Sequence, residues 1–292
     1  MKFLRRFLIA SSLLLLPIAV SAQALDTTKI DQALGRPGQR TGDVYRLSFP
    51  RTDLHVSVHG LTLKPGFALG SWAAFTGTDD KAMVMGDLVL LEDELNPAMD
   101  KLRSAGFEIL AVHNHLLGET PHVMYMHYMG HGTATQLAAS VRAALETSKT
   151  PLEKPAAAAE EAAPPAWVNS VEDAVGRKGA FKGGVLSYGV PLLDTITVDG
   201  SAIAPAAGVA IVINFQAADS GNVATTGDFV LTAGEVNPVI SELHAHHIQV
   251  TALHSHMLTE QPRLFFMHFW SVGTPESVGA GIAAALKRVS TK

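Results

Sequence analysis

Residues 113–132 read HNHLLGETPHVMYMHYMGHG, and residues 254–273 read HSHMLTEQPRLFFMHFWSVG. The two stretches superpose at an offset of 141 residues, with His, Leu, Glu, Pro, Met and Gly at matching places. The same offset aligns Gly35-Arg36 with Gly176-Arg177, Gly86-Asp87 with Gly227-Asp228, and Asn96-Pro97 with Asn237-Pro238. A one-residue slip, placed where Gly66 is matched to Gly208, is later compensated. Repeated identity at one long offset indicates that the chain is a duplication.

The segment between the two copies differs from both in composition. Residues 150–166 read TPLEKPAAAAEEAAPPA, and a stretch so rich in Pro, Ala and Glu is typical of an extended linker. We therefore predict domains at residues 27–149 and 167–291. Two copies are too few for a solenoid, so the expected architecture is a tandem pair of globular domains.

Hydrophobic periodicity gives the same order of elements in each copy. In the first copy it predicts strands within residues 44–49, 54–58, 67–75, 85–91, 107–113 and 123–129. A helix is expected from Asn96-Pro97 to about Ala105. A second helix should open at Thr133, with Leu137, Val141, Ala144 and Leu145 on one face. Helices set apart from a run of antiparallel strands predict an α+β fold, with helices packed on an antiparallel sheet.

The N-terminus has the pattern of a secretory signal. Residues 1–24 carry Lys2, Arg5 and Arg6, then an apolar run, then small residues. No later stretch has the roughly 18 to 20 consecutive apolar residues of a spanning helix, so we expect no membrane span after signal cleavage. The predicted location is periplasmic or secreted.

Charge and cysteine content exclude several functions. The leader holds three of the 22 Lys and Arg and none of the 27 Asp and Glu, so the net charge moves from −5 to −8 when it is removed. An acidic chain without a basic cluster is a poor candidate for binding nucleic acid. The chain contains no cysteine, which excludes disulfides, thiolate metal sites and a lipid-modified Cys. A metal ion would have to be held by His and carboxylate groups.

Both copies contain the pattern H-x-H-x3-E-x7-H. Residues i and i+2 of a strand point to the same side, and the next strand can present the third imidazole opposite the first two. Three neutral imidazoles with a fourth position for Glu or water describe a zinc-type site, and copper is the alternative cation. We expect the imidazoles to meet at a common centre in each half of the molecule. The candidate metal ligands are His113, His115 and His127 in the first copy and His254, His256 and His268 in the second.

The role of the glutamate is open between three possibilities. Glu119 and Glu260 could be a fourth ligand, orient a ligand, or act as general base on metal-bound water in a metal-dependent hydrolase. An alternative function is a periplasmic protein that binds a metal or an unidentified small ligand without turnover. A third alternative is a metal-free His/Glu hydrogen-bonded network that serves packing. The pattern leaves open whether the two motifs form two sites or one shared site.

These residues resemble the LppY/LpqO family of exported bacterial proteins, a domain of unknown function. The resemblance rests on Gly35-Arg36, on the stretch at residues 113–132 and on its diverged copy at residues 254–273. It covers most of the chain after the leader and implies export and the duplicated domain. The family name refers to lipoproteins, but this chain has no Cys for acylation, so the resemblance implies no membrane anchor here.

Overall fold

The structure is a computed structural model that describes residues 24–153 and 163–292. Nearly all of the predicted leader and the middle of the predicted linker lie outside these residues. Among the described helices, none is long and apolar enough to cross a membrane.

The first repeat is a six-stranded antiparallel sheet with three helices. The sheet has the order β1-β2-β5-β6-β9-β7. Its strands are β1 (Gln39–Thr41), β2 (Val44–Pro50), β5 (Gly70–Gly77), β6 (Ala82–Leu91), β9 (Val123–Gly132) and β7 (Glu108–His113). The helices are α1 (Thr27–Leu34), α2 (Glu92–Ser104) and α3 (Ala134–Leu145). A small separate sheet joins β4 (Leu61–Thr62), β3 (Ser57–Val58) and β8 (Glu119–Thr120), and the short 3-10 helix η1 spans Pro65–Phe67.

The second repeat has the same sheet in the same order, β10-β11-β14-β15-β17-β16. Its strands are β10 (Ala180–Lys182), β11 (Val185–Pro191), β14 (Ala210–Ala217), β15 (Val223–Leu231), β17 (Phe265–Gly273) and β16 (Gln249–His254). The helices are α4 (Ala166–Val175), α5 (Ala233–Ala245) and α6 (Pro275–Leu286). A hairpin of β12 (Ile196–Val198) and β13 (Ser201–Ile203) and the 3-10 helices η2 (Pro205–Ala207) and η3 (Asp219–Gly221) complete it. The predicted duplicated α+β fold is confirmed.

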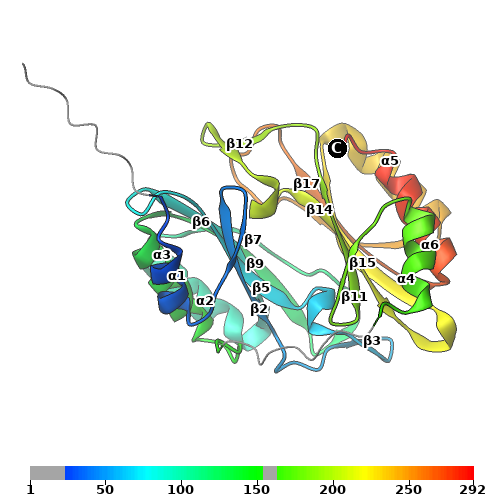
Figure 1. Cartoon of the computed structure of the whole chain (residues 1–292), viewed down its shortest axis with the longest axis horizontal. Coiled ribbons are helices and arrows are strands. Elements are labelled where there is room, and N and C mark those ends of the chain that lie inside the picture. Colours follow the sequence, from blue (N-terminus) through cyan, green and yellow to red (C-terminus); the bar gives the residue numbers. More distant parts are fainter. Residues whose placement is uncertain (1–23, 154–162) are drawn as a thin grey trace, which may run out of the picture.

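The two sheets face each other, and the helices cover their outer faces (Figure 1). Alternation along each strand explains this arrangement, because successive side chains point to opposite faces. On β6, Val84 and Leu88 point outward into the core under the helices of the first repeat. Met85 points inward and joins the core of the second repeat, as do Ala74 and Met129. The inner faces of the sheets therefore form the junction between the repeats.

Two helices begin earlier than the sequence predicted. α2 begins at Glu92, four residues before Asn96, and contains Pro97 in its second turn. The Glu94 carboxylate accepts a hydrogen bond from the backbone N–H of Leu91 at 2.9 Å, which caps the helix at this earlier point. In α5 the equivalent Glu235 accepts from the backbone N–H of Thr232 at 2.7 Å. The acidic first turn therefore defines the helix start, and the Asn-Pro pair does not.

The Gly-Arg pair that opens each copy marks the end of a helix that the periodicity did not predict. α1 ends at Gly35 with φ of 77°, and α4 ends at Gly176 with φ of 76°. Glycine adopts this left-handed conformation at a helix C-terminus without a steric penalty. The pairing of Gly35 with Gly176 thus reflects a C-cap.

Two further predictions about the first copy are wrong. Of the strand expected at residues 54–58, only Ser57–Val58 is a strand, within the small separate sheet. The match of Gly66 with Gly208 also fails, because η1 begins at Pro65 and η2 at Pro205. Gly208 therefore corresponds to Ala68, and the two residues share positive φ angles of 104° and 126°. The slip between the copies runs in the opposite direction.

Candidate metal centre at the junction of the repeats

The central strands place the third histidine of each motif on an inner face. In the first repeat, His127 on β9 lies directly opposite Asp87 on β6. In the second, His268 on β17 lies directly opposite Asp228 on β15. Gly227, before Asp228, has no room for a side chain, since a Cβ atom there would lie 2.1 Å from the Val212 carbonyl oxygen. In each repeated Gly-Asp pair, the aspartate therefore lies on the inner face beside the histidine, while the glycine allows close packing on the other side of the strand.

The edge strands deliver the other two histidines of each motif. β7 ends at His113 and β16 ends at His254, and both strands carry a register shift against their neighbour a few residues earlier. A β-bulge of this kind turns the side chains that follow it. The loop after β7 is bound to the second repeat, where the Thr251 hydroxyl donates to the His115 carbonyl oxygen at 2.5 Å and Asn114 donates to the Thr251 carbonyl oxygen at 3.3 Å.

All six predicted histidines gather in one cluster between the sheets. Each ring of one motif stacks on a ring of the other motif, and the pairs are related by an approximate twofold symmetry. The centre-to-centre distances are 3.7 Å for His113–His254, 3.8 Å for His115–His268 and 3.7 Å for His127–His256. Tyr125 lies against His115 and Phe266 against His256, so aromatic rings line the outside of the cluster.

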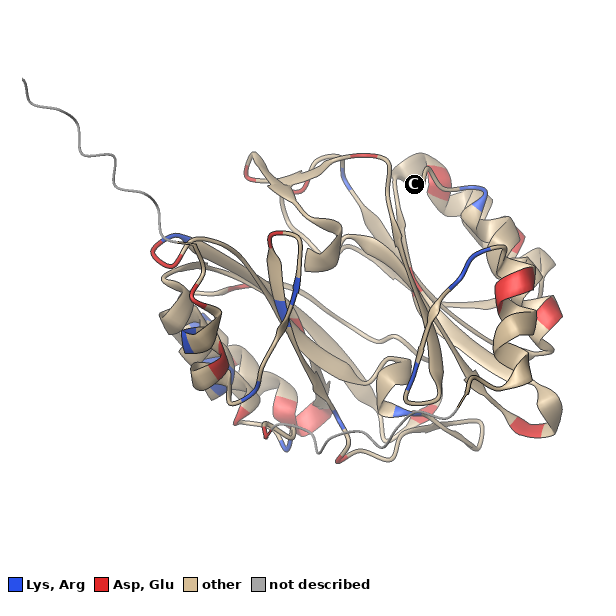
Figure 2. Ribbon diagram, viewed as in Figure 1, with Lys and Arg blue, Asp and Glu red and all other residues tan. Residues whose placement is uncertain are grey.

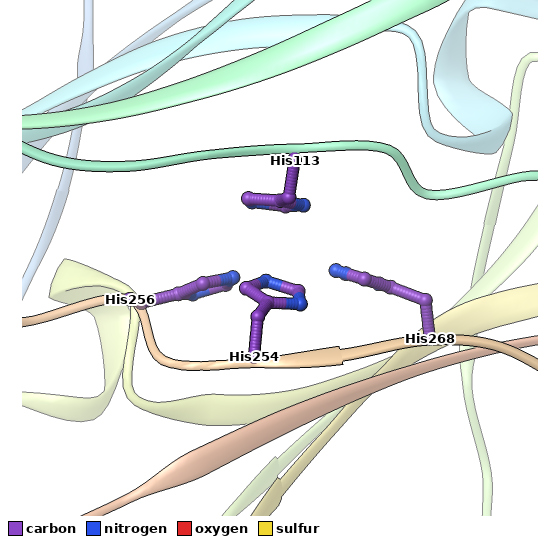
Figure 3. A group of neighbouring side chains, drawn as sticks. All are labelled: His113, His254, His256 and His268. Atoms are coloured by element: carbon purple, nitrogen blue, oxygen red, sulfur yellow. The ribbon is translucent and has the colours of Figure 1, made fainter.

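Four of these imidazoles have ligand atoms close enough for one ion. The atoms of His113, His254, His256 and His268 all lie within 4.8 Å of one another. The ligand atoms of a tetrahedral ion at the zinc–imidazole distance are about 3.4 Å apart, so a contraction of up to about 1.4 Å would close the set. Figure 3 shows His113 on one side, His254 on the other, and the nitrogens of His256 and His268 directed toward each other.

The ring centres of the second motif are spaced as three ligands of one ion would be. Their centres form a triangle with sides of 4.8, 5.0 and 6.1 Å, and the circle through its corners has a radius of about 3.1 Å. An ion about 2.1 Å from an imidazole nitrogen would lie about 3.2 Å from the ring centre. The His113 ring is 3.7, 5.0 and 5.2 Å from these three rings, so it lies above the triangle that they form and nearest to His254.

The cluster nitrogens are buried without partners. Nε2 of all six histidines has no hydrogen-bond partner, although most of these side chains are buried. The Nδ1 of His113 lies 3.1 Å from the Asn114 carbonyl oxygen, and the Nδ1 of His268 lies 3.0 Å from that of Gly227. A carbonyl can only accept, so Nδ1 carries the proton in both residues. Their Nε2 lone pairs are therefore free to bind a cation.

Burial keeps the imidazoles neutral. It lowers the pKa of His113 to about 4 and that of His254 to about 3. The pKa values of the other four are also lowered, by burial first and by neighbouring imidazoles second; these are His115, His127, His256 and His268. Neutral imidazole is the form that binds metal ions.

Two carboxylates that sequence reasoning missed lie beside the cluster. Asp87 Oδ2 is 3.9 Å from His127 Nε2, while Asp228 is 4.0 Å from His256 Nδ1 and 3.8 Å from His268 Nδ1. Burial raises the pKa of Asp87 to about 8, and burial together with the charge of Asp87 raises that of Asp228. Charged residues otherwise lie mostly on the outer helices and loops (Figure 2). The identity of the Gly-Asp pair in both copies was the sequence signal for these two carboxylates. Only the strand pairing shows that each aspartate lies beside a histidine of the motif.

The two glutamates of the motif bond within their own turns. Glu119 lies 2.7 Å from His122 Nδ1, and Glu260 lies 3.2 Å from Arg263. Glu260 also accepts from the backbone N–H of Leu264 at 3.0 Å, and Glu119 is 3.5 Å from the equivalent nitrogen of Val123. Their predicted role as general base or ligand stays a prediction.

The expectation of a separate centre in each half needs correction. The group of four close ligand atoms takes His113 from the first motif and three histidines from the second. Because the inner faces of the two sheets lie opposite each other, both motifs meet at one place. Within the described residues, their six histidines form one shared cluster. The six histidines named from the sequence are thus brought together, and their assignment as ligands stays a prediction.

Fold and site together define a class: tandemly duplicated α+β proteins with a buried histidine cluster where the repeats meet. The chain belongs to the family described as Domain of Unknown Function (DUF1259), whose model matches residues 28–147 and again residues 169–288. This match supports an uncharacterised family with two tandem repeats, and the name LppY/LpqO does not come from it. No curated protein is significantly similar to the chain.

Solved structures show only distant likeness. EtuB from Clostridium kluyveri is 11% identical, with 86% of this chain and 88% of that chain covered and a TM-score of 0.20. The trimeric bacterial microcompartment shell protein PduB is 12% identical, with coverage of 86% and 89% and a TM-score of 0.20. An unknown protein from Galdieria sulphuraria is 9% identical, with coverage of 72% and 90% and a TM-score of 0.18. At such TM-scores these likenesses carry no argument.

Proposed function

We propose that this chain is a metal-binding protein whose single site is built from both repeats. One observation carries the proposal: four buried or half-buried imidazoles from three different strands or their ends have ligand atoms within 4.8 Å of one another. Four nitrogen ligands suit a four-coordinate zinc ion, which is our first candidate, and copper is the second.

The free nitrogens favour metal binding over a metal-free network. A hydrogen-bonded network would pair the imidazole nitrogens with one another or with the carboxylates, yet all six Nε2 atoms and one oxygen of Asp87 lack a partner. An unsatisfied buried polar group costs about 1–3 kcal/mol, so these groups destabilise the fold unless they gain a partner. A bound cation would satisfy several of these groups at once.

We limit the proposal to binding and do not extend it to hydrolysis. Burial of His113, His256 and His268 leaves little of the cluster open to a substrate. The glutamates that were candidates for a general base bond within their own turns.

We also propose that the protein is exported, as the LppY/LpqO resemblance implies. The support is the leader pattern of residues 1–24, with three basic residues before an apolar run. A site made of imidazoles without thiols would suit an oxidising compartment.

The test is elemental analysis of protein purified without a polyhistidine tag, followed by calorimetric titration of the metal-free protein with zinc and copper. We expect one ion per chain, and we expect His268→Ala to weaken binding by more than about tenfold. The matched control is His131→Ala, because His131 is exposed and lies outside the cluster. No bound metal, or equal affinity in both variants, would exclude the proposal.

A second measurement separates metal binding from packing. If the histidines serve packing alone, His113→Ala lowers the free energy of unfolding equally with and without zinc. Metal binding predicts that zinc stabilises the wild type by about 3 kcal/mol at a hundredfold excess over Kd, and the variant by much less.

A further inference from the structure

Trp72 and Val212 occupy equivalent positions on the two inner faces. Trp72 on β5 pairs with Asp87, and Val212 on β14 pairs with Asp228. Each residue therefore stands directly beside one of the two carboxylates that border the histidine cluster. Since the backbone positions match, any difference in access to the carboxylates comes from the side chains around them.

The first-repeat side is covered. The Trp72 ring lies against Gly208 of the second repeat, where a Cβ atom would be 2.8 Å from the ring. The Arg46 guanidinium stacks on the Trp72 ring, 3.9 Å from the ring centre, and donates to the Ala206 carbonyl oxygen at 3.0 Å. Trp72 and Arg46 together form a Trp-Arg cover. Behind this Trp-Arg cover, the Asp87 side chain is only 7% exposed.

The second-repeat side lacks the cover. Ser187 stands in place of Arg46, and its hydroxyl donates to Asn214 at 2.7 Å within its own sheet. Val212 is 41% exposed although it lies on an inner sheet face. The Asp228 side chain is 18% exposed, more than twice the exposure of Asp87.

Asp228 connects this open side to the cluster. Its two carboxylate oxygens lie 4.0 Å from His256 and 3.8 Å from His268, and both histidines belong to the group of four close ligands. Within residues 24–153 and 163–292, no Lys or Arg forms an ion pair with Asp228. A partly exposed carboxyl group beside neutral imidazoles offers oxygen ligands to a cation that enters from solvent.

We infer that metal ions enter and leave the cluster past Val212, and that Asp228 binds the incoming ion before the histidines take it. This inference rests on the proposed metal-binding function. Trp72 and Arg46 close the equivalent path on the first-repeat side, so of these two paths only the one past Val212 is open. A valine leaves the space that a tryptophan fills at the same place in the other repeat.

The experiment measures the kinetics of Zn²⁺ exchange in the full chain. Association is followed by stopped-flow mixing of metal-free protein with Zn²⁺, and release by transfer to excess EDTA. Val212→Trp, which copies the closed side, is expected to slow association and release together by about tenfold or more. Because both rates change together, Kd should move by less than about threefold.

Two matched variants control for damage to the fold. Val212→Ala keeps the opening and is expected to exchange Zn²⁺ as the wild type does. Trp72→Val copies the open side, and adding it to Val212→Trp should restore the exchange rates through the second path. Asp228→Asn, which changes no bulk but removes the carboxylate as a ligand, should reduce the association rate by at least about tenfold.

The outcomes separate the two proposals. If the wild type binds no Zn²⁺ at equilibrium, the proposed function fails and this inference fails with it. If the wild type binds Zn²⁺ but Val212→Trp exchanges it at the wild-type rate, the entrance is elsewhere and only the inference is overturned. If Val212→Trp does not fold, the Asp228→Asn variant tests the inference instead. Association of Zn²⁺ with Asp228→Asn at the wild-type rate would then overturn the inference.

Discussion

Replacing Asp87 by Asn should stabilise the metal-free protein, although the change removes a buried carboxyl group that lies beside the histidine cluster. In the folded protein, burial raises the pKa of Asp87 to about 8 from an ordinary value of 3.8. At any pH between these two values, the folded state holds a proton that the unfolded state releases. Folding must then pay for protonating the carboxyl, and asparagine, which has nearly the same shape, removes that cost.

The size of the effect follows from the pKa. The folded chain binds more protons than the unfolded chain between pH 3.8 and about 8, so the free energy of unfolding falls as pH rises through this window. Because pH 7 is about 3 units above the ordinary pKa of 3.8, keeping the carboxyl protonated in the folded state costs about 4 kcal/mol at that pH. The gain should vanish below pH 4 and stop growing above pH 8.

Urea unfolding in EDTA, followed by circular dichroism from pH 4 to pH 9, measures the effect. The control is Asp100→Asn on α2, because Asp100 is exposed on the outer side of the first repeat. Asp228→Asn should behave as Asp87→Asn does, since its pKa is raised as well. A variant less stable than the wild type at pH 7, or a difference that stays constant from pH 4 to pH 8, would refute the reasoning.

Two further changes test the cluster and the core. Burial lowers the pKa of His113 from 6.5 to about 4, so the stability that its neutral form contributes above pH 6.5 is lost as pH falls toward 4. Urea unfolding in EDTA should show a loss from this residue of about 3 kcal/mol, and His113→Gln should abolish that loss. An unchanged pH slope of the unfolding free energy in the variant would contradict this. Arg51 is fully buried and bonds to Glu94 at 2.7 Å and Asp53 at 2.8 Å, so Arg51→Ala should lower the free energy of unfolding by about 3–5 kcal/mol. Arg51→Leu with Glu94→Gln should cost much less, because Leu192 fills the equivalent place in the second repeat; equal losses in both variants would contradict the expectation.

Repetition made much of this molecule readable from its residues. Identical spacing in two diverged copies predicted the duplication and singled out the six histidines without any structure. Alternation and helical periodicity predicted the antiparallel strands and the apolar face of α3, whose Leu137, Val141, Ala144 and Leu145 are all buried. Such patterns are local, because they depend on which side of one strand or helix must face a core.

Local patterns failed where a capping contact decided the structure. α1 is short, and its boundaries are set by Asp26, which accepts from the backbone of Thr28 at 3.2 Å, and by Gly35. The start of α2 depends on one carboxylate-to-backbone bond at Glu94. The slip between the copies was misplaced for a related reason: a glycine and an alanine can share a positive φ angle, so matching glycines is not a sure guide.

The sequence by itself determined that the chain is a doubled α+β domain and which imidazoles belong to its repeated motif. Only the tertiary structure decided that the two motifs meet in one cluster, that Asp87 and Asp228 border it, and that the two sides of the cluster differ in access. The physical reason is that these facts depend on how two sheets face each other. A strand's sequence specifies which side chains point inward, but the partner surface that those side chains meet is formed by residues more than a hundred positions away.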